Sequence, residues 1–252
     1  RGMGSTIGQD AELAERTARW VKEAATRVPV SIKVTPLVAD LPHIAHAVQK
    51  SGADAITAIN TVKCLIGVDI DSYVPYPVVD GKSSYGGYSG AAIKPISLRC
   101  VAEIAKAVDM PISATGGITT WRDAVEFLLC GARNLQVCTA VMKHGFRVIE
   151  DLTDGLSVYL EDKGMSSVEE LVGLALPNIV EHSRLSREYK PVSKINLETC
   201  VKCDVCYIAC QDGGHQAITL DEKRLPHVDE EKCVGCAMCA SVCPVFECIQ
   251  MM

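Results

Sequence analysis

The chain has 252 residues, of which 48% are hydrophobic and 22% charged, and its formal net charge is −6 at pH 7. This composition is typical of a globular protein with room for one large and one small domain, and it excludes disorder as an overall description. The acidic balance offers no basic surface to a nucleic acid, and no run of about 18 apolar residues is present that would span a membrane. We therefore expect neither a nucleic-acid partner nor a membrane partner.

Residues 1–151 alternate between strand-like and helix-like segments, which is typical of βα units and a parallel sheet. The pattern predicts a helix capped by Asp10 and ending near residue 27, and a second helix over residues 40–51. Two later helices are expected up to about residue 130 and from about residue 144. The expected strands cover residues 30–35, 54–59, 112–114 and 135–137.

Four parallel βα units make half of an eight-stranded barrel, and an unclosed half leaves sheet edges and one sheet face without partners. We therefore predict the C-terminal half of a (β/α)8 TIM barrel, with the upstream half in sequence that precedes Arg1. The alternative is a complete open doubly wound sheet, but no Gly-x-Gly-x-x-Gly motif opens a helix to support a dinucleotide site. The connection over residues 61–95 is unusually long, which indicates a functional loop.

Residues 152–193 are helical and polar in pattern and are expected to form a linker. Residues 194–252 hold two runs with the spacing Cys-x2-Cys-x2-Cys-x3-Cys, and each cysteine of the second run lies 33 positions after its counterpart. This is an internal duplication, and the spacing is that of bacterial ferredoxins. The eight cysteines are Cys200, Cys203, Cys206, Cys210, Cys233, Cys236, Cys239 and Cys243.

The fourth cysteine of a ferredoxin run ligates the other cluster. The spacing therefore predicts one [4Fe–4S] cluster on Cys200, Cys203, Cys206 and Cys243, and a second on Cys233, Cys236, Cys239 and Cys210. Zinc also uses Cys-x2-Cys pairs, but two zinc sites do not call for this repeated spacing with a proline after the last cysteine. So many cysteines outside a small secreted scaffold favour a reducing cytoplasm.

The other five cysteines, Cys64, Cys100, Cys130, Cys138 and Cys248, are expected by default to be small buried hydrophobes.

The ends of the predicted barrel strands carry candidate site residues. Thr115-Gly116-Gly117 and Cys138-Thr139 follow the last two strands, where a barrel of this type commonly binds phosphate. Lys33 lies within an apolar strand, where an ammonium favours an anionic partner such as a reduced flavin. Each feature has a plainer interpretation: a turn for the glycines, and a strand-end lysine that reaches solvent.

Asn60 and Thr61 end the next strand, and an asparagine amide presents a donor and an acceptor in one plane, as an imide substrate edge requires. The alternative for Asn60 is a turn-capping role.

Several motifs together resemble one family. They are Arg1-Gly-Met-Gly4, Lys33-Val-Thr-Pro36, Ala58-Ile-Asn-Thr61, Tyr85-Gly-Gly-Tyr-Ser-Gly90, Ala114-Thr-Gly-Gly-Ile118 and Gln136-Val-Cys-Thr139, followed by the double cysteine run. In this order they resemble the pyrimidine-reducing part of the dihydropyrimidine dehydrogenases, with a dihydroorotate dehydrogenase-like barrel before a 2[4Fe–4S] ferredoxin-like α+β domain. The similarity is greatest to the bacterial subunit type that carries FMN and works with a separate FAD-containing, NAD(P)H-oxidising subunit.

The resemblance implies that FMN is held around Lys33, Gly90, Thr115, Gly116, Gly117, Cys138 and Thr139, and that Asn60 and Thr61 contact the pyrimidine. It implies that electrons pass from NAD(P)H through FAD and the two clusters to FMN, and then to uracil or thymine. The catalytic residue of the family is a cysteine upstream of the Arg-Gly-Met-Gly segment, so Cys64 is not assigned that role. We also expect the protein to form an oligomer.

Two other hypotheses remain open at this stage. A dihydroorotate dehydrogenase relative would share the FMN barrel but would require an added cationic anchor for the substrate carboxylate. A chain with half a barrel would alternatively serve only as an iron–sulfur electron carrier or an assembly module. A flavin absorbance band would separate the enzymes from the carrier.

Overall fold

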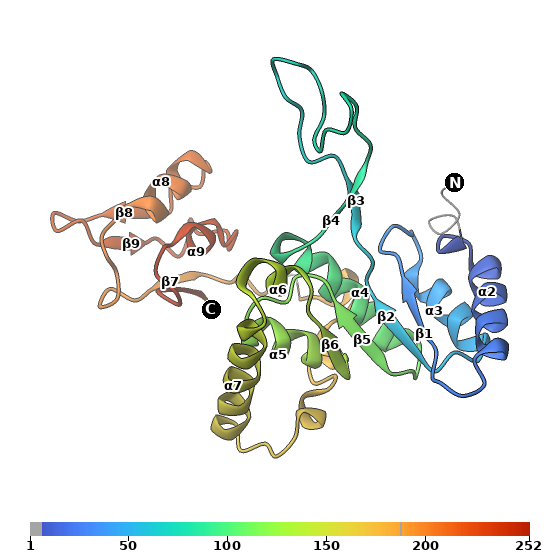
Figure 1. The fold of residues 1–252 in the computed structure, drawn as a ribbon. Coiled ribbons are helices and arrows are strands. Elements are labelled where there is room, and N and C mark those ends of the chain that lie inside the picture. Colours follow the sequence, from blue (N-terminus) through green and yellow to red (C-terminus); the bar gives the residue numbers. More distant parts are fainter. Residues whose placement is uncertain (1–6, 187) are drawn as a thin grey trace. The chain divides into compact units, whose positions relative to one another are not determined.

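The computed structural model describes residues 7–186 and 188–252, and the chain divides into two compact units, Arg1–Ile179 and Val180–Met252. Each unit has its own buried core (Figure 1). The segment at residues 1–4 that contributes to the family resemblance lies outside the described residues.

The first unit is built on a four-stranded parallel sheet with the strand order β1-β2-β5-β6. Lys33 pairs with Thr57, and Thr57 pairs with Ser113, so the register is continuous across the sheet. The predicted parallel α/β fold with four βα units is confirmed, and in the described chain β1 and β6 are the edges. The strands are β1 (Ser31–Val34), β2 (Ala55–Ala58), β5 (Ile112–Thr115) and β6 (Asn134–Gln136).

Two helices of this unit begin at a capping aspartate. Asp10 Oδ1 accepts a hydrogen bond from the Leu13 N–H, and Asp40 Oδ1 accepts one from the His43 N–H, each at 2.9 Å. The predicted cap at Asp10 is therefore confirmed, and Asp40 caps the second helix in the same way; each satisfies an N–H that the helix itself cannot pair. The helices are α2 (Ala11–Ala24), α3 (Leu41–Lys50), α4 (Lys94–Ala107), α5 (Trp121–Leu129), α6 (Thr139–His144) and α7 (Arg147–Asp162).

The two faces of the sheet differ in chemistry because strand side chains alternate. One face supplies apolar residues such as Ile56 and Ile112 to the helix-covered core, which also contains Phe127. The other face is polar: Ser31 Oγ and Thr57 Oγ1 lie 2.8 Å apart, and the amides and hydroxyls of β5 and β6 continue the row. In a closed barrel this second face would be the interior.

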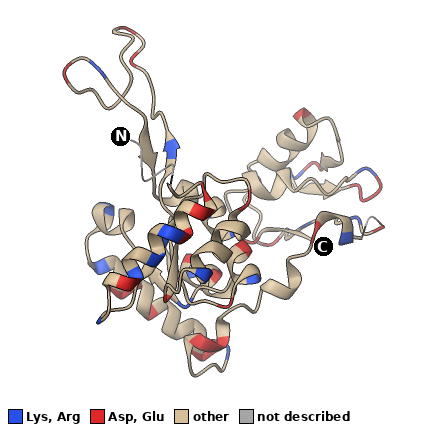
Figure 2. Cartoon of the chain, turned by 90° about the vertical axis from the view of Figure 1, so that its right-hand side faces the viewer, with Lys and Arg blue, Asp and Glu red and all other residues tan. Residues whose placement is uncertain are grey.

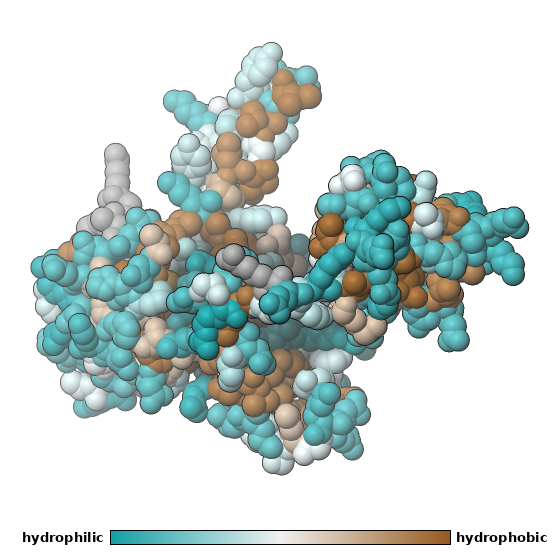
Figure 3. Space-filling view, turned by 180° about the vertical axis from the view of Figure 1, so that it is seen from behind, coloured by the Kyte–Doolittle hydropathy of each residue, from teal (hydrophilic) through white to brown (hydrophobic). Residues whose placement is uncertain are grey.

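The long connection after β2 forms an arm that extends away from the sheet (Figure 1). Strands β3 (Val62–Cys64) and β4 (Gly86–Tyr88) pair antiparallel at its base, and the 3-10 turn η1 (Ala91–Ile93) leads from it into α4. Asp69 organises the loop, because it accepts hydrogen bonds from Ser72 and from the Tyr76 hydroxyl, which lower its pKa to about 2. Apolar side chains remain exposed along the arm (Figure 3).

The segment that we expected to form a linker is divided between the two units. Helix α7 continues to Asp162, and the chain then returns to α5, where the Gly173 N–H donates to the Leu128 carbonyl at 3.0 Å. Leu171 is buried in this return. The first unit therefore extends to Ile179, well beyond the predicted barrel boundary at residue 151. The 3-10 turns here are η2 (Val168–Leu171), η3 (Leu176–Asn178) and η4 (His182–Arg184).

The second unit repeats one pattern of strands and helices. Strand β7 pairs antiparallel with β10, and β8 pairs antiparallel with β9. Its first strand and first helix each begin 33 positions before their counterparts, in agreement with the duplication of the cysteine runs. The elements are β7 (Ser193–Ile195), α8 (Val205–Asp212), β8 (Ile218–Leu220), β9 (Pro226–Val228), α9 (Met238–Val242) and β10 (Ile249–Met251).

Acidic and basic side chains are interspersed along the helices of the first unit (Figure 2), as expected for a chain with 25 Lys and Arg and 31 Asp and Glu residues. None of the helices in residues 7–186 and 188–252 combines the length and the apolar character that a bilayer crossing needs.

Candidate functional site

A pocket with about 660 Å³ of empty space, partly open to solvent, lies at the carboxyl ends of the parallel strands. This is the end at which barrels of this type place their chemistry. The pocket brings together every residue that the family resemblance assigned to FMN, and also Thr61. Those residues are Lys33, Gly90, Thr115, Gly116, Gly117, Cys138 and Thr139.

Thr115, Gly116 and Gly117, here called the Gly-Gly turn, follow β5 and line this pocket. Gly116 has φ +120° and Gly117 has φ +94°, conformations that favour glycine. The N–H groups of Gly116, Gly117 and Ile118 have no hydrogen-bond acceptor within the described residues. Partly buried N–H groups favour a ligand acceptor, so the turn is suited to bind an anion such as phosphate.

The remaining predicted residues differ in exposure. Lys33 is exposed, because no described segment covers the polar face of the sheet, so its ammonium is not buried as the sequence suggested. Asn60 is exposed and outside the residues that line the pocket, and its Oδ1 accepts a hydrogen bond from the Thr61 N–H at 2.9 Å. That contact fits the turn-capping alternative, and it still leaves the Asn60 NH2 group available.

Gln136 is a pocket residue that the sequence analysis did not assign. Its Nε2 donates to Ser113 Oγ at 2.7 Å and lies 3.5 Å from Thr57 Oγ1. The alternation of polar and apolar residues along β2, β5 and β6 could have predicted that Thr57, Ser113 and Gln136 lie side by side on one face of the sheet. The network fixes the Gln136 amide at the floor of the pocket.

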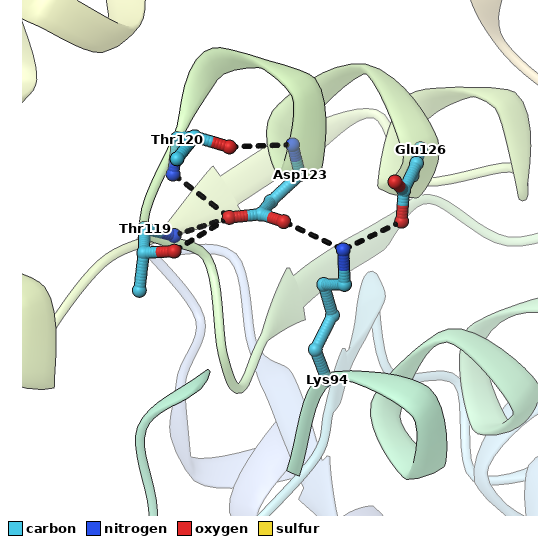
Figure 4. Close-up of polar contacts among 5 residues, drawn as sticks. All are labelled: Lys94, Thr119, Thr120, Asp123 and Glu126. Carbon is cyan, nitrogen blue, oxygen red and sulfur yellow. Dashed lines mark hydrogen bonds and ion pairs between the residues drawn. The ribbon is translucent and has the colours of Figure 1, made fainter. Parts of the chain in front are cut away.

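A partly buried ion pair between Lys94 and Asp123 (Figure 4) lies beside the Gly-Gly turn, and the sequence did not predict it. Lys94 Nζ lies 2.7 Å from Asp123 Oδ1 and 3.0 Å from Glu126 Oε2. Asp123 Oδ2 accepts from the Thr119 N–H, the Thr119 hydroxyl and the Thr120 N–H at 2.7–2.9 Å. Burial alone would raise the pKa of Asp123, but these hydrogen bonds outweigh it and lower the pKa to about 2. At Lys94, the hydrogen bonds and charges of Asp123 and Glu126 outweigh the effect of burial and raise the pKa of the ammonium above its ordinary value of 10.5.

The cysteines of the second unit line two separate cavities, with about 380 Å³ and 350 Å³ of empty space. Each cavity takes three cysteines from one run and the fourth from the other run, as the ferredoxin pattern predicts. The first is lined by Cys200, Cys203, Cys206 and Cys243, and also by Cys248 from outside the two runs; the second is lined by Cys210, Cys233, Cys236 and Cys239.

The backbone around both cavities follows the duplication. Lys202 and Asp204 have positive φ, and so do Gly235 and Ala237 at the equivalent positions of the second run. Left-handed residues between cysteines turn successive peptides so that three sulfurs can surround one cavity. The two loops therefore have the same shape despite different side chains.

Hydrogen bonds and charge differ between the two cavities. The Ala217 N–H donates to Cys210 Sγ at 3.3 Å, a contact that supports a thiolate. Asp204 borders the other cavity and forms an ion pair with Arg224. Burial, together with the smaller effect of the charges of neighbouring cysteines, raises the pKa of the Cys206 thiol to about 11.

The default expectation for the other five cysteines holds for only two of them. Cys100 and Cys248 are buried, whereas Cys64 and Cys130 are half-buried. Cys138 is exposed and lines the flavin-type pocket, because it follows β6 at the open end of the sheet. Its default assignment as a buried hydrophobe is therefore wrong.

The cysteines of the second unit fit iron–sulfur clusters, and the pocket residues of the first unit fit a flavin. Among the described residues, no three His, Cys, Asp or Glu side chains converge on a point suited to a single metal ion. In a four-iron cluster each cysteine binds a different iron, so the ligands surround a volume, as these eight do. The Gly-Gly turn and Lys33 likewise offer N–H donors and a cation to the phosphate and ring of a flavin.

Each of the two units matches a known protein family. The model of the dihydroorotate dehydrogenase family matches residues 2–160, and the model described as "4Fe-4S dicluster domain" matches residues 193–251. The chain belongs to the dihydroorotate dehydrogenase family and carries an iron–sulfur domain after the flavoprotein-type domain.

The relatives divide according to how much of the chain they match. The "NAD-dependent dihydropyrimidine dehydrogenase subunit PreA" of Escherichia coli (strain K12) is 49% identical over 253 residues, which covers 99% of this chain and 61% of the relative. The "Dihydroorotate dehydrogenase B (NAD(+)), catalytic subunit" of Pyrococcus abyssi is 46% identical over 176 residues, covering 70% of this chain and 57% of the relative. The corresponding Pyrococcus furiosus protein is 46% identical over 175 residues, covering 69% and 56%. The chain thus spans about three fifths of the length of these relatives.

Proposed function

We propose that this chain belongs to the pyrimidine-reducing component of a dihydropyrimidine dehydrogenase, which reduces uracil or thymine to the 5,6-dihydropyrimidine with electrons that originate from NAD(P)H. The observation that carries the proposal is the pocket in which Lys33 and the unpartnered N–H groups of the Gly-Gly turn lie together at the strand ends. The match of a relative with this activity over 99% of the chain supports it.

FMN is the cofactor that we propose for this pocket, and when bound it supplies the hydride that adds to C6 of the pyrimidine. The Gly-Gly turn binds the phosphate through its N–H groups. Lys33 provides the positive charge for the electron-rich edge of the reduced ring. Gln136, held by Ser113, presents its amide to the same pocket. Gly90 allows close packing, because a Cβ there would lie 3.2 Å from Thr139 Cγ2.

Asn60 and Thr61 are proposed to orient the pyrimidine. The Asn60 side chain keeps an NH2 donor for an imide carbonyl, while its oxygen holds the Thr61 backbone in place. We assign no catalytic acid within the 252 residues.

Two [4Fe–4S] clusters on the crossed cysteine sets are proposed to deliver electrons to the flavin. A partner subunit that carries FAD and oxidises NAD(P)H supplies them, since no dinucleotide fingerprint is present in the sequence. The cysteine usage supports a reducing cytoplasm, and we propose an oligomeric assembly.

Dihydroorotate oxidation is the second candidate, favoured by the family match and by the 46% identity to dihydroorotate dehydrogenase catalytic subunits. Two observations weigh against it. Those relatives match only about 70% of the chain, whereas the dihydropyrimidine dehydrogenase relative also matches the cysteine-rich unit. Among the described pocket residues Lys33 is the one Lys or Arg, which leaves no second cation for a substrate carboxylate.

The test is a cofactor and electron-supply measurement on the full-length gene product, purified without oxygen. We expect about one FMN, eight iron and eight labile sulfide per chain, because two cubes each contain four of both. NADH alone should not bleach the flavin or the clusters, and addition of the FAD-containing partner should. Stoichiometric zinc without sulfide, or reduction by NADH without a partner, would contradict the proposal.

A further inference from the structure

The Gly-Gly turn is held from behind by the first turn of α4. Ser97, which is fully buried, donates from Oγ to the Thr115 carbonyl at 2.6 Å. A Cβ on Gly117 would lie 2.7 Å from the Lys94 nitrogen and 2.8 Å from its Cα, so the turn rests directly on the Lys94 backbone. The absence of a side chain at Gly117 therefore allows the contact with α4.

The Lys94 side chain acts on the segment that follows the turn, through Asp123. Its ammonium binds Asp123 in the first turn of α5, and Asp123 in turn binds the backbone at Thr119 and Thr120, immediately after the Gly-Gly turn (Figure 4). The segment between Thr115 and Thr120 is thus fixed at its start by Ser97 and at its end by Asp123, and both contacts lead back to α4.

The charges of this arrangement are largely removed from solvent. The Asp123 side chain is 9% exposed and that of Lys94 is 26% exposed. Neither residue lines the pocket, so neither contacts the proposed flavin directly. Apart from the contact of Lys94 with Glu126, the side-chain hydrogen bonds of the pair go to the Thr119 and Thr120 end of the loop, so the pair acts on the shape of the loop.

We propose that Lys94 and Asp123 are positioning residues that hold the N–H groups of the Gly-Gly turn in the geometry that binds the flavin phosphate. This inference rests on the proposed FMN site. An oxyanion that accepts two or three N–H groups depends on their common direction, and a turn released at one end loses that direction. The alternative is that the pair only stabilises the start of α5.

The positioning role and the purely stabilising role predict different affinities for FMN and riboflavin. The two flavins share the same ring, but only FMN carries a phosphate. In the full-length gene product, Lys94→Met removes the ammonium and keeps the length of the side chain. Asp123→Asn keeps an oxygen for the backbone contacts and removes the charge, so it carries the test if Lys94→Met does not fold. Dissociation constants for both flavins would be measured by quenching of flavin fluorescence on the apoflavoprotein.

We expect FMN affinity to fall by about tenfold or more in both variants, as for loss of a hydrogen bond to a charged group, with riboflavin affinity unchanged. Lys22→Met is the matched control, because Lys22 forms a similar pair with Asp54, which also binds the Val30 N–H, away from the pocket. The control should keep the preference for FMN over riboflavin.

A lower melting temperature with an unchanged preference for FMN would overturn the inference and leave the flavin site intact. A wild-type protein that binds FMN no better than riboflavin would instead overturn the proposed phosphate site, and the inference with it.

Discussion

Gly117→Ala should destabilise the first unit well beyond the cost of an ordinary left-handed glycine. At φ +94° an alanine is strained, and its Cβ would lie 2.7–2.8 Å from backbone atoms of Lys94, which cannot move without displacing α4. Strain of this kind costs about 1–3 kcal/mol, and forced overpacking typically adds about 1–3 kcal/mol. The control is Gly52→Ala, where φ is +84° but no atom lies within 4 Å of the new Cβ, so only the strain applies.

The assay is thermal unfolding followed by tryptophan fluorescence, because Trp20 and Trp121, the two tryptophans of the sequence, both lie in the first unit. An extra 1–3 kcal/mol corresponds to a melting temperature about 2–12 °C below that of Gly52→Ala, at roughly 2–4 °C per kcal/mol for a unit of this size. FMN retention should fall in Gly117→Ala alone. Equal shifts in the two variants would refute the close approach of the turn to Lys94.

Three further predictions concern the clusters, the substrate and pH. Cys243→Ser should damage the cluster on Cys200 rather than that of its own run, and electron paramagnetic resonance showing the reverse would refute the crossed pairing. Asn60→Ala should lower pyrimidine turnover with the flavin and cluster spectra unchanged; loss of either cofactor would indicate a structural role. The pKa of Asp123 is lowered from 3.8 to about 2, so its stabilising effect is complete above about pH 4 and is lost as the pH falls through 2. Asp123→Asn should therefore lose less stability than wild type between pH 4 and 2 in urea unfolding, and equal losses would exclude this carboxylate.

Local patterns were sufficient for most of the fold. The cap at Asp10 and the apolar spacing of the helices predicted the βα units, because both signals act within a few residues. The crossed cysteine sets followed from spacing alone, because three closely spaced cysteines can surround only one cavity.

Long-range contacts were not predictable in this way. Lys94 and Asp123 are 29 residues apart, and nothing around Lys94 indicates its partner. The position of Asp123 could have been read from the sequence. Thr120-x-x-Asp123 is a capping box, and it begins α5 three residues after Gly117. Helix α4 (Lys94–Ala107) was not predicted, because the expected long connection ended at residue 95 and no helix was assigned before the strand at residues 112–114. The return of the chain to α5 near Leu171 was not predicted either, because the burial of this residue depends on tertiary packing.

The central claim, that this flavin site reduces a neutral pyrimidine, is tested most directly by competing the two candidate reactions in one preparation. The full-length gene product, supplied with a low-potential artificial electron donor and no NAD(P)H-oxidising partner, would be assayed for reduction of uracil and thymine. Dihydroorotate oxidation would be followed in parallel with an artificial acceptor. We predict pyrimidine reduction well above dihydroorotate oxidation, because Lys33 is the one Lys or Arg among the described pocket residues and its proposed partner is the flavin. Dihydroorotate oxidation that exceeds reduction of both pyrimidines would contradict the account.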